Sequence, residues 1–332
     1  MTTRALRSPA LAGLLAIAVG CSGSGSGPGG TGGSGGAAGT TGTLAYRPCP
    51  ASTRVGQFSI QLIAAADPAP AYAQFAGRVR NAPDPTENWR EMSQDGACRL
   101  VIGPELVCST PCTAGTICAG QNQCINEPVS QDIGVVSVGG LATPLSATAI
   151  ANSQNTYYAS LSAMPYPPFS HETPIRLSSA GGAYAAFTLQ GRGVVPLDFA
   201  GTGLQVIARD KALPVTWTAP AQAGSARIFV RLDIGHHGGY AARVECDVAD
   251  TGSMTIPAGL ITQLIGQGTA GFPTISLTRQ TVDSTTVAPG CVEFAIASPV
   301  ERPAMVEGIV SCSDEVPCPA GKTCKDQLRI CE

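Results

Sequence analysis

ARIFVRLDIG, residues 226–235, is the stretch of the sequence that decides the fold. Apolar side chains recur there at every second position, and charged side chains fall between them. The apolar set is Ile228, Val230, Leu232 and Ile234, and the charged set is Arg227, Arg231 and Asp233. A period of two is typical of a β-strand that buries one face. We therefore expect the charged set to point outward.

The same alternation recurs in AARVECDV (241–248), TISLTR (274–279) and VEFAIAS (292–298). Strands that each bury one face pack together as a sandwich of sheets. The composition agrees, because the chain has 40 Gly and 26 Pro, only 13% charged residues and almost no long helical periodicity. The predicted fold class is all-β, a β-sandwich with many turns. One short helix is expected in IPAGLITQLIGQG (256–268).

The 332 residues are enough for several domains. We expect a signal peptide (1–20), an anchor cysteine with a Gly/Ser linker (21–45), a small β domain (46–107), a four-cysteine module (108–128), a β-strand-rich region (129–203), a β-sandwich (204–305) and a second four-cysteine module (306–332). The strand LPVTWTAP (213–220) resembles strands of immunoglobulin-like and fibronectin-like bacterial modules in its Val-x-Trp-x-x-Pro pattern. That resemblance implies an Ig-like sandwich.

The N-terminus has the layout of an export signal. Arg4 and Arg7 precede an apolar run that is too short for a permanent membrane helix, and the run ends at Cys21. The residues Ala18-Val19-Gly20-Cys21 resemble the lipobox of bacterial lipoproteins, with Ala18 in place of the usual Leu. The resemblance implies that the Cys21 thiol is acylated and becomes the mature N-terminus. Ser22 after the cysteine implies sorting to the outer membrane.

A Gly/Ser-rich stretch without charge, residues 22–43, follows this cysteine. Such a composition cannot bury enough apolar surface to fold, so we expect a flexible tether. Its root-mean-square reach is roughly 25–30 Å. The pentapeptide Gly32-Gly33-Ser34-Gly35-Gly36 matches the serine-hydrolase pattern G-x-S-x-G, but the strand and helix that this motif needs are not expected around it.

The chain has thirteen cysteines, so twelve remain once Cys21 is lipidated. Eight of them form two clusters that share the pattern Pro-Cys-x-Ala-Gly-x-x-Cys: Cys108, Cys112, Cys118 and Cys124, and Cys312, Cys318, Cys324 and Cys331. Each cluster is too small for a core, so we expect two disulfides in each. Zinc is the alternative, but the C-x2-C knuckles of zinc sites are missing. The clusters are loosely similar to the cysteine-rich part of Dickkopf proteins, which implies interaction.

The other four cysteines are Cys49, Cys98, Cys246 and Cys291. Proximity in sequence predicts the pairs Cys49–Cys98 and Cys246–Cys291. One observation counts against the second pair. Cys246 is in step with the inward Val244 and Val248, whereas Cys291 is out of step with Val292 and its inward neighbours.

Three stretches could carry chemistry or bind a ligand. Asp250-Thr251-Gly252-Ser253 matches the catalytic loop of pepsin-like proteases, but those enzymes need two such loops and this chain has one. We therefore interpret Asp250 as part of a turn, with its carboxylate on the local backbone and Gly252 at positive φ. His236 and His237 could supply two metal ligands. Neighbouring side chains on an extended segment point to opposite faces, however, so such a pair seldom binds one ion. His171 lies in the proline-rich loop PYPPFSHETP (165–174), which is either a local core plug or a binding loop.

These observations predict a non-catalytic cell-envelope lipoprotein with β-sandwich and cysteine-rich interaction modules, in adhesion or envelope assembly. The chain as a whole resembles uncharacterised envelope lipoproteins of Gram-negative bacteria. We expect membrane attachment through Cys21, a protein or glycan partner, no cofactor and no metal. Nucleic acid is not expected, because the net charge is −3 and no Lys/Arg run occurs. The alternative is a surface hydrolase that uses Asp250 or the pair His236/His237.

Overall fold

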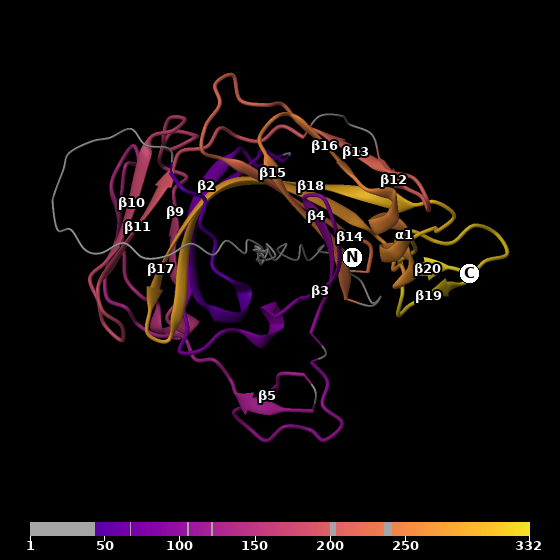
Figure 1. Cartoon of the computed structure of the whole chain (residues 1–332), viewed down its shortest axis with the longest axis horizontal. Coiled ribbons are helices and arrows are strands. Elements are labelled where there is room, and N and C mark those ends of the chain that lie inside the picture. Colours follow the sequence, from indigo (N-terminus) through magenta and orange to yellow (C-terminus); the bar gives the residue numbers. More distant parts are fainter. Residues whose placement is uncertain (1–43, 67, 105, 121, 200–203, 236–240) are drawn as a thin grey trace, which may run out of the picture.

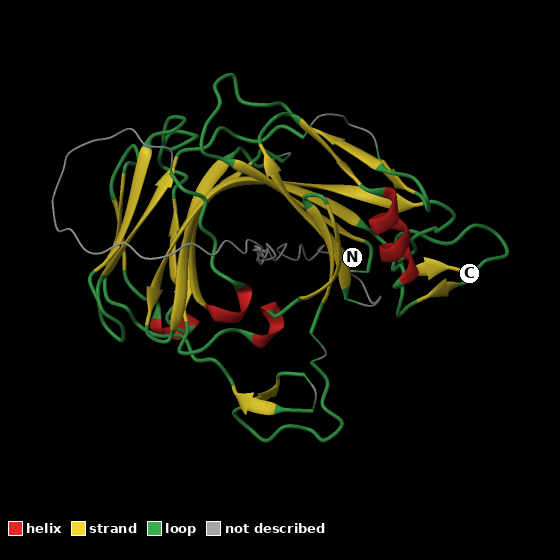
Figure 2. Ribbon diagram, in the orientation of Figure 1, coloured by secondary structure: helices red, strands yellow, loops and turns green. Residues whose placement is uncertain are grey.

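The computed structural model describes residues 44–66, 68–104, 106–120, 122–199, 204–235 and 241–332. Over these residues the fold is all-β with a single α-helix, as the alternating pattern predicted (Figure 2). The helix α1 (Ala258–Gly266) begins directly after Pro257 and confirms the helix expected there. Three short 3-10 turns complete the helical elements: η1 (Ala51–Thr53), η2 (Pro85–Glu87) and η3 (Ala151–Ser153).

A ten-stranded sheet forms the centre of the molecule. Its order is β3-β4-β15-β14-β17-β18-β1-β2-β9, and β12 also pairs with β18. Figure 1 shows the sheet curved into an arch, with β17 and β18 across the top and the β3 and β2 ends on opposite sides. The strands are β1 (Arg54–Ile63), β2 (Tyr72–Val79), β3 (Arg90–Asp95), β4 (Cys98–Ile102), β9 (Tyr157–Ser160), β12 (Gln205–Ile207), β14 (Arg227–Asp233), β15 (Ala242–Ala249), β17 (Thr274–Val287) and β18 (Gly290–Val306).

The convex face of the arch is apolar and two smaller assemblies cover it. A four-stranded sheet in the order β11-β10-β7-β8 covers one half, and the pair β13-β16 with α1 covers the other. The strands are β7 (Val136–Gly139), β8 (Leu145–Ala147), β10 (Pro174–Ser179), β11 (Phe187–Arg192), β13 (Leu213–Thr216) and β16 (Ser253–Ile256). The molecule is therefore made of two β-sandwich-like halves that share one long sheet.

Each half has its own hydrophobic core. Core A lies under α1 and includes Leu100, Trp217, Ile228, Val230, Leu232, Val244, Leu260 and Leu277. Core B lies under the four-stranded sheet and includes Phe58, Ile60, Phe75, Tyr157, Leu177, Val292, Phe294 and Ile296. The inward positions predicted for β14 are confirmed, since Ile228, Val230 and Leu232 are fully buried in core A.

The predicted small β domain (46–107) and the predicted sandwich (204–305) are parts of one sheet. β1 pairs with β18 in parallel, and β4 pairs with β15 in antiparallel register. Both pairings join segments more than a hundred residues apart, as the partners Arg54↔Cys291 and Cys98↔Cys246 show. Local alternation identifies a strand but does not identify its partner strand. The boundary predicted between these two domains is therefore crossed by strand pairs of a single sheet.

The twelve expected cysteines form six disulfides. The predicted pairs Cys49–Cys98 and Cys246–Cys291 are wrong: the bonds are Cys49–Cys291 and Cys98–Cys246. Cys98 and Cys246 lie directly opposite each other on β4 and β15, with side chains toward core A. Cys291 lies on the other face, so its being out of step with Val292 was the correct signal.

The two four-cysteine modules share one connectivity, first to third and second to fourth cysteine. The bonds are Cys108–Cys118 and Cys112–Cys124 in the first module, and Cys312–Cys324 and Cys318–Cys331 in the second. Each module holds one small hairpin, β5 (Thr116–Cys118) with β6 (Cys124–Asn126), and β19 (Cys324–Lys325) with β20 (Ile330–Cys331). The internal repeat and its two disulfides per copy are confirmed.

The modules differ in how they meet the body. The first projects away from the arch at its lower side (Figure 1). The second packs on the body, because the Gly271 amide donates to the Leu328 carbonyl at 2.7 Å and the Phe272 amide donates to the Ser311 hydroxyl at 2.9 Å. Cys312 is fully buried there. The same disulfide connectivity therefore occurs in a module that projects from the body and in a module that packs against it.

We predict that Gly77→Ala destabilises the protein by about 1–3 kcal/mol, the usual cost of an overpacked core. Gly77 lies opposite Phe58 in the β1–β2 pair, and a Cβ at this position would overlap the Phe58 ring. Gly139→Ala in β7 is the matched control, since a Cβ there meets no atom within 4 Å. Urea unfolding of both variants tests this, and equal losses would contradict the packing argument.

Candidate functional site

The concave face of the arch carries charged and polar side chains. They occupy the alternate strand positions that do not enter the two cores: Arg99, Arg227, Arg231, Arg243, Glu245, Asp247, Gln57, Gln280 and Glu293. The alternating pattern predicts that such positions face solvent. Several are buried instead, Glu245 and Glu293 among them. The concave face is therefore the candidate functional surface.

Residues 44–53, here called the N-terminal segment, lie against this face. The Cys49–Cys291 disulfide ties the segment to the start of β18, and the Arg47 amide donates to the Val282 carbonyl at 3.0 Å. The Arg47 side chain also pairs with Asp283 at 2.6 Å. One covalent bond and two polar contacts thus fix the segment on β17 and β18.

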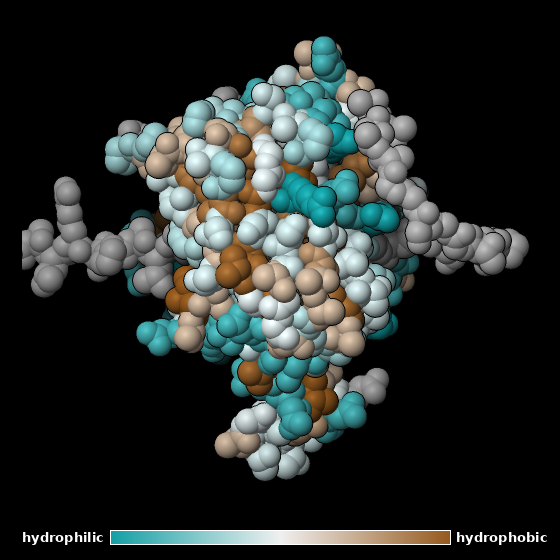
Figure 3. All heavy atoms as spheres, turned by 90° about the vertical axis from the view of Figure 1, so that its left-hand side faces the viewer, coloured by the Kyte–Doolittle hydropathy of each residue, from teal (hydrophilic) through white to brown (hydrophobic). Residues whose placement is uncertain are grey.

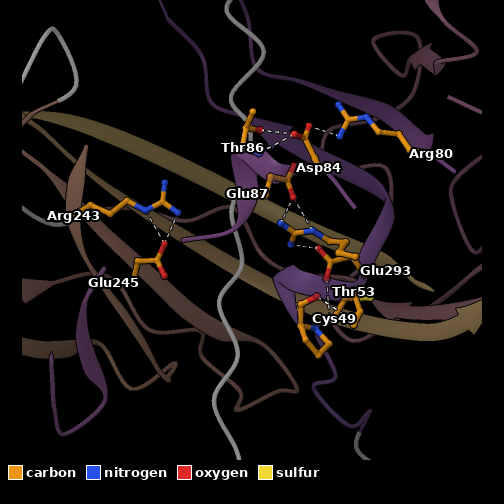
Figure 4. Close-up of polar contacts among 11 residues, drawn as sticks. Cys49, Thr53, Arg80, Asp84, Thr86, Glu87, Arg243, Glu245 and Glu293 are labelled. Carbon is orange, nitrogen blue, oxygen red and sulfur yellow. Dashed lines mark hydrogen bonds and ion pairs between the residues drawn. The ribbon is translucent and has the colours of Figure 1, made fainter. Parts of the chain in front are cut away.

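A buried ion cluster lies under the segment (Figure 4). The guanidinium of Arg54 bonds Glu293 at 2.9 Å and Glu87 at 2.5 Å. Glu293 is 0% exposed and also accepts the backbone amide of Cys49 at 3.0 Å. Burial raises the pKa of Glu293, and the charge of Arg54 opposes this rise without cancelling it. The cluster positions β1, β18 and the loop before β3 relative to one another.

A cavity of about 630 Å³ lies between the N-terminal segment and strands β3, β4, β14 and β15. We call it the arch cavity. Two ion pairs line it, Arg227–Asp247 at 2.5 Å and Arg99–Glu245 at 2.8 Å. Burial raises the pKa of Asp247, against the lowering effects of the bonded Arg227 and of Tyr46.

Glu245 joins the arch cavity to a second arginine. Its other oxygen accepts from Arg243, whose guanidinium carbon lies 3.6 Å from the centre of the Trp89 ring. Arg243 and Glu245 appear on one side of Figure 4 and the Glu87–Glu293 cluster appears on the other. The floor of the cavity is therefore held by charge-assisted bonds, which are stronger than neutral hydrogen bonds.

A second cavity, of about 620 Å³, lies where the first four-cysteine module joins the body. Arg80 and Asp84 form an ion pair on the body side. Asp84 also accepts the amide of Thr86 at 3.0 Å and its hydroxyl at 2.7 Å. On the module side, Leu106 and Val107 line the cavity, and Val107 is 79% exposed. This junction combines a fixed ion pair with exposed apolar surface.

Asp250 lies in a turn between β15 and β16, and Gly252 has a φ of 99°, as expected for a turn. The expected bond from its carboxylate to the local backbone is not what the structure has. One oxygen accepts the Trp217 indole at 2.7 Å and an Arg279 nitrogen at 3.1 Å, and the other accepts Arg279 at 2.6 Å. The carboxylate thus neutralises Arg279, which is 1% exposed.

The other predicted residues have different outcomes. Cys21, His236 and His237 lie outside the described residues. Phe169 is buried in core B with Tyr166 packed against it, so the loop around His171 serves as a local core plug. His171 Nε2 lies 3.1 Å from the Gln222 carbonyl oxygen.

Among the described residues, the groups close enough to share a metal ion are cysteines of the two modules, all of which are disulfide-bonded.

Comparison with protein-family models matched no family, and a search of curated proteins found no relative. Within the described part of the chain, no helix is both long enough and apolar enough to span a bilayer.

We predict that Asp250→Ala lowers the free energy of unfolding by about 3–5 kcal/mol, the usual cost of leaving a buried partner charge unpaired. Arg279 would keep its bonds to the carbonyls of Pro196 and Thr218 but lose its counter-charge. Asp198→Ala is the matched control, because Asp198 is exposed and its carboxylate accepts the Thr218 hydroxyl at 3.1 Å without neutralising a buried charge. Urea unfolding of both variants measures the difference, and equal stability of the two would contradict a structural role.

We predict that the stabilising effect of Asp84 depends on pH. Burial alone would raise its pKa, but the bonds from Thr86 and the charge of Arg80 together hold the pKa below its ordinary value of 3.8. A carboxylate with a lowered pKa stabilises the folded state above the unfolded pKa, and this effect is lost as the pH falls through the folded pKa. The stability difference between the native protein and Asp84→Asn should therefore shrink below pH 3.8.

Chemical denaturation at neutral and acidic pH measures that difference. Asp95→Asn, at the exposed end of β3, is the control. A difference for Asp84→Asn that is the same at both pH values would contradict the prediction.

Proposed function

We propose that the protein is a non-catalytic lipoprotein of the cell envelope, anchored through Cys21, that presents the first four-cysteine module to a protein partner. The observation that carries this proposal is the position of that module. It projects from the arch in Figure 1 and forms a separate lobe below the body in Figure 3. A lobe that contributes nothing to either hydrophobic core is available for contact.

The module is built to keep its shape outside the body. Its two disulfides, Cys108–Cys118 and Cys112–Cys124, close loops of similar length and restrain the β5–β6 hairpin from both sides. Disulfides substitute for a core in units of this size. A rigid module loses little conformational entropy when it binds, which favours affinity.

The junction of the module supplies the chemistry that a protein partner would use. Leu106 and Val107 are exposed apolar residues beside the Arg80–Asp84 ion pair. Protein interfaces commonly combine an apolar centre with a polar rim. The acidic balance of the chain, 23 acidic against 20 basic residues, argues against nucleic acid.

The export and anchoring part of the proposal is supported by the lipobox-like sequence before Cys21 and by the six disulfides. Disulfides persist in oxidising compartments and are rare in reducing ones. Ser22 directly after the cysteine further favours the outer membrane.

The hydrolase alternative has less support. Both oxygens of Asp250 are engaged by Arg279, and one of them also by Trp217, so the carboxylate is not placed to activate water. The pair His236/His237 lies outside the described residues. We keep the binding function as the proposal.

We predict that a photo-cross-linking amino acid at Val107 captures a defined envelope protein in intact cells. Val107 is exposed and lies at the base of the projecting module. The matched control is the same amino acid at Val316, which is 45% exposed in the second, docked module. Mass spectrometry identifies the captured chain. Capture of the same proteins from both positions, or of none from Val107, would contradict a role for the first module.

We also predict that Cys21→Ala abolishes incorporation of radiolabelled palmitate and moves the protein from the membrane to the soluble fraction. The thiol is the proposed site of acylation, and a lipid chain adds about 0.8 kcal/mol of membrane affinity per buried methylene. Ser22→Ala is the control, since it leaves the thiol in place. A Cys21→Ala protein that remains in the membrane fraction would contradict the proposed anchor.

A further inference from the structure

The arch cavity is a second site, separate from the projecting module. It lies on the concave face between the N-terminal segment and strands β3, β4, β14 and β15. Its volume of about 630 Å³ falls within the range of roughly 300–1,000 Å³ that is typical of small-ligand pockets. Its walls come from segments far apart in sequence, so the folded sheet is required to form it.

The charged groups of the cavity are paired. Arg227 bonds Asp247, Arg99 bonds Glu245, and Arg47 bonds Asp283 just beyond the rim. Paired charges offer little net attraction to a free anion or cation. Each pair still has hydrogen-bonding capacity for a ligand, because a carboxylate has about four acceptor sites and a guanidinium has five N–H donors. One ion pair uses only part of these sites.

A hydrogen-bond chain runs from the sheet into the cavity. Gln280, opposite Arg227 in the β14–β17 register, donates from Nε2 to the Tyr46 hydroxyl at 2.9 Å. The Tyr46 hydroxyl in turn bonds Asp247. Gln280 is fully buried, and its Oε1 has no hydrogen-bond partner among the described residues. Gln280 is not among the residues that line the cavity, so it holds the Tyr46 hydroxyl from behind, and Tyr46 and Asp247 are the members of this chain that face a ligand.

Apolar faces accompany these polar groups. Phe229 lines the cavity between Arg227 and Arg231 on β14, and Pro48 and Pro50 line the opposite wall. The Tyr46 ring lies 5.5 Å from the guanidinium carbon of Arg227. A mixture of flat apolar surface and edges rich in both donors and acceptors fits a molecule that has the same two features.

We propose that the arch cavity binds a neutral sugar residue of a glycan. Each sugar hydroxyl is at once a donor and an acceptor, so adjacent hydroxyls complement paired carboxylate and guanidinium groups. The C–H face of the ring complements Phe229 and the prolines. An anionic ligand would have to compete with Asp247 and Glu245 for their arginines, and a cation would have to compete for the carboxylates.

Two disulfides hold the walls in place. Cys98–Cys246 joins β4 to β15 on one wall, and Cys49–Cys291 fixes the N-terminal segment on the other. A site whose walls are fixed before binding loses little entropy on binding. This geometry suits recognition of a rigid ring.

The test is binding of the full chain, purified in detergent, to an array of neutral and acidic oligosaccharides, followed by calorimetric titration of the strongest neutral one. We expect binding of at least one neutral oligosaccharide. Asp247→Asn should weaken it by roughly tenfold, or about 1.4 kcal/mol, because an amide oxygen is a weaker hydrogen-bond acceptor than a carboxylate. Gln94→Ala is a second variant that keeps the fold, since Gln94 lines the cavity from an exposed position and bonds only the Gly96 carbonyl of its own turn.

Asp198→Asn on the convex side is the matched control and should leave binding unchanged. Circular dichroism reports whether each variant is folded, and Gln94→Ala decides the question if Asp247→Asn does not fold. Three results would overturn the proposal: no neutral oligosaccharide binds, only acidic ones bind, or binding persists undiminished in both cavity variants. None of these results bears on the protein contact proposed at Val107, so the two proposals fail separately.

Discussion

The antiparallel pairing of β17 with β18 is the constraint on which the rest of the structure depends. The strands are 14 and 17 residues long and remain in register from Thr274↔Pro303 to Val287↔Gly290. One part of the pair contributes Leu277 to core A, and another part contributes Phe294 to core B. Because strands this long cross both cores, the two sandwich-like halves cannot separate without breaking the central ladder.

The same alternation that builds two cores on one face forces polar groups onto the other. In a flat sheet these groups would be solvated, but the curvature of the arch and the N-terminal segment enclose several of them. Enclosed charges must be paired, and Arg54 with Glu293 and Arg243 with Glu245 are. The same holds for Arg279 with Asp250, which are buried on the core A side of the sheet. Such pairs contribute little net stability, yet removing one partner is costly, so they fix which segments meet.

Part of this arrangement was predictable from the sequence. Strand positions, the inward set of β14, the short helix and the repeated disulfide modules follow from local periodicity and cysteine spacing, which are properties of neighbouring residues. Strand order does not, because the parallel pairing of β1 with β18 depends on closing a loop of more than two hundred residues. The candidate cavity was missed for the same reason. Arg227 and Asp247 look like solvent-facing charges until the sheet curves and Tyr46 covers them. One local signal was available. Val292 points into core B, so its neighbour Cys291 points to the concave face, and the disulfide of Cys291 has to form on that face.

The Cys49–Cys291 bridge has a mechanical consequence. It spans 242 residues of sequence and joins the N-terminal segment to the start of β18. If the chain is held at a membrane through its N-terminus, a pulling force enters the folded body at Cys49 and passes through a covalent bond into the central strand. β1 and β2 lie inside the loop that this bond closes, so tension from the anchor cannot peel them off the sheet edge one after the other. The body would respond to shear as a single unit, and the chain that could be extended before the force reaches the core is limited to the residues between Cys21 and Cys49.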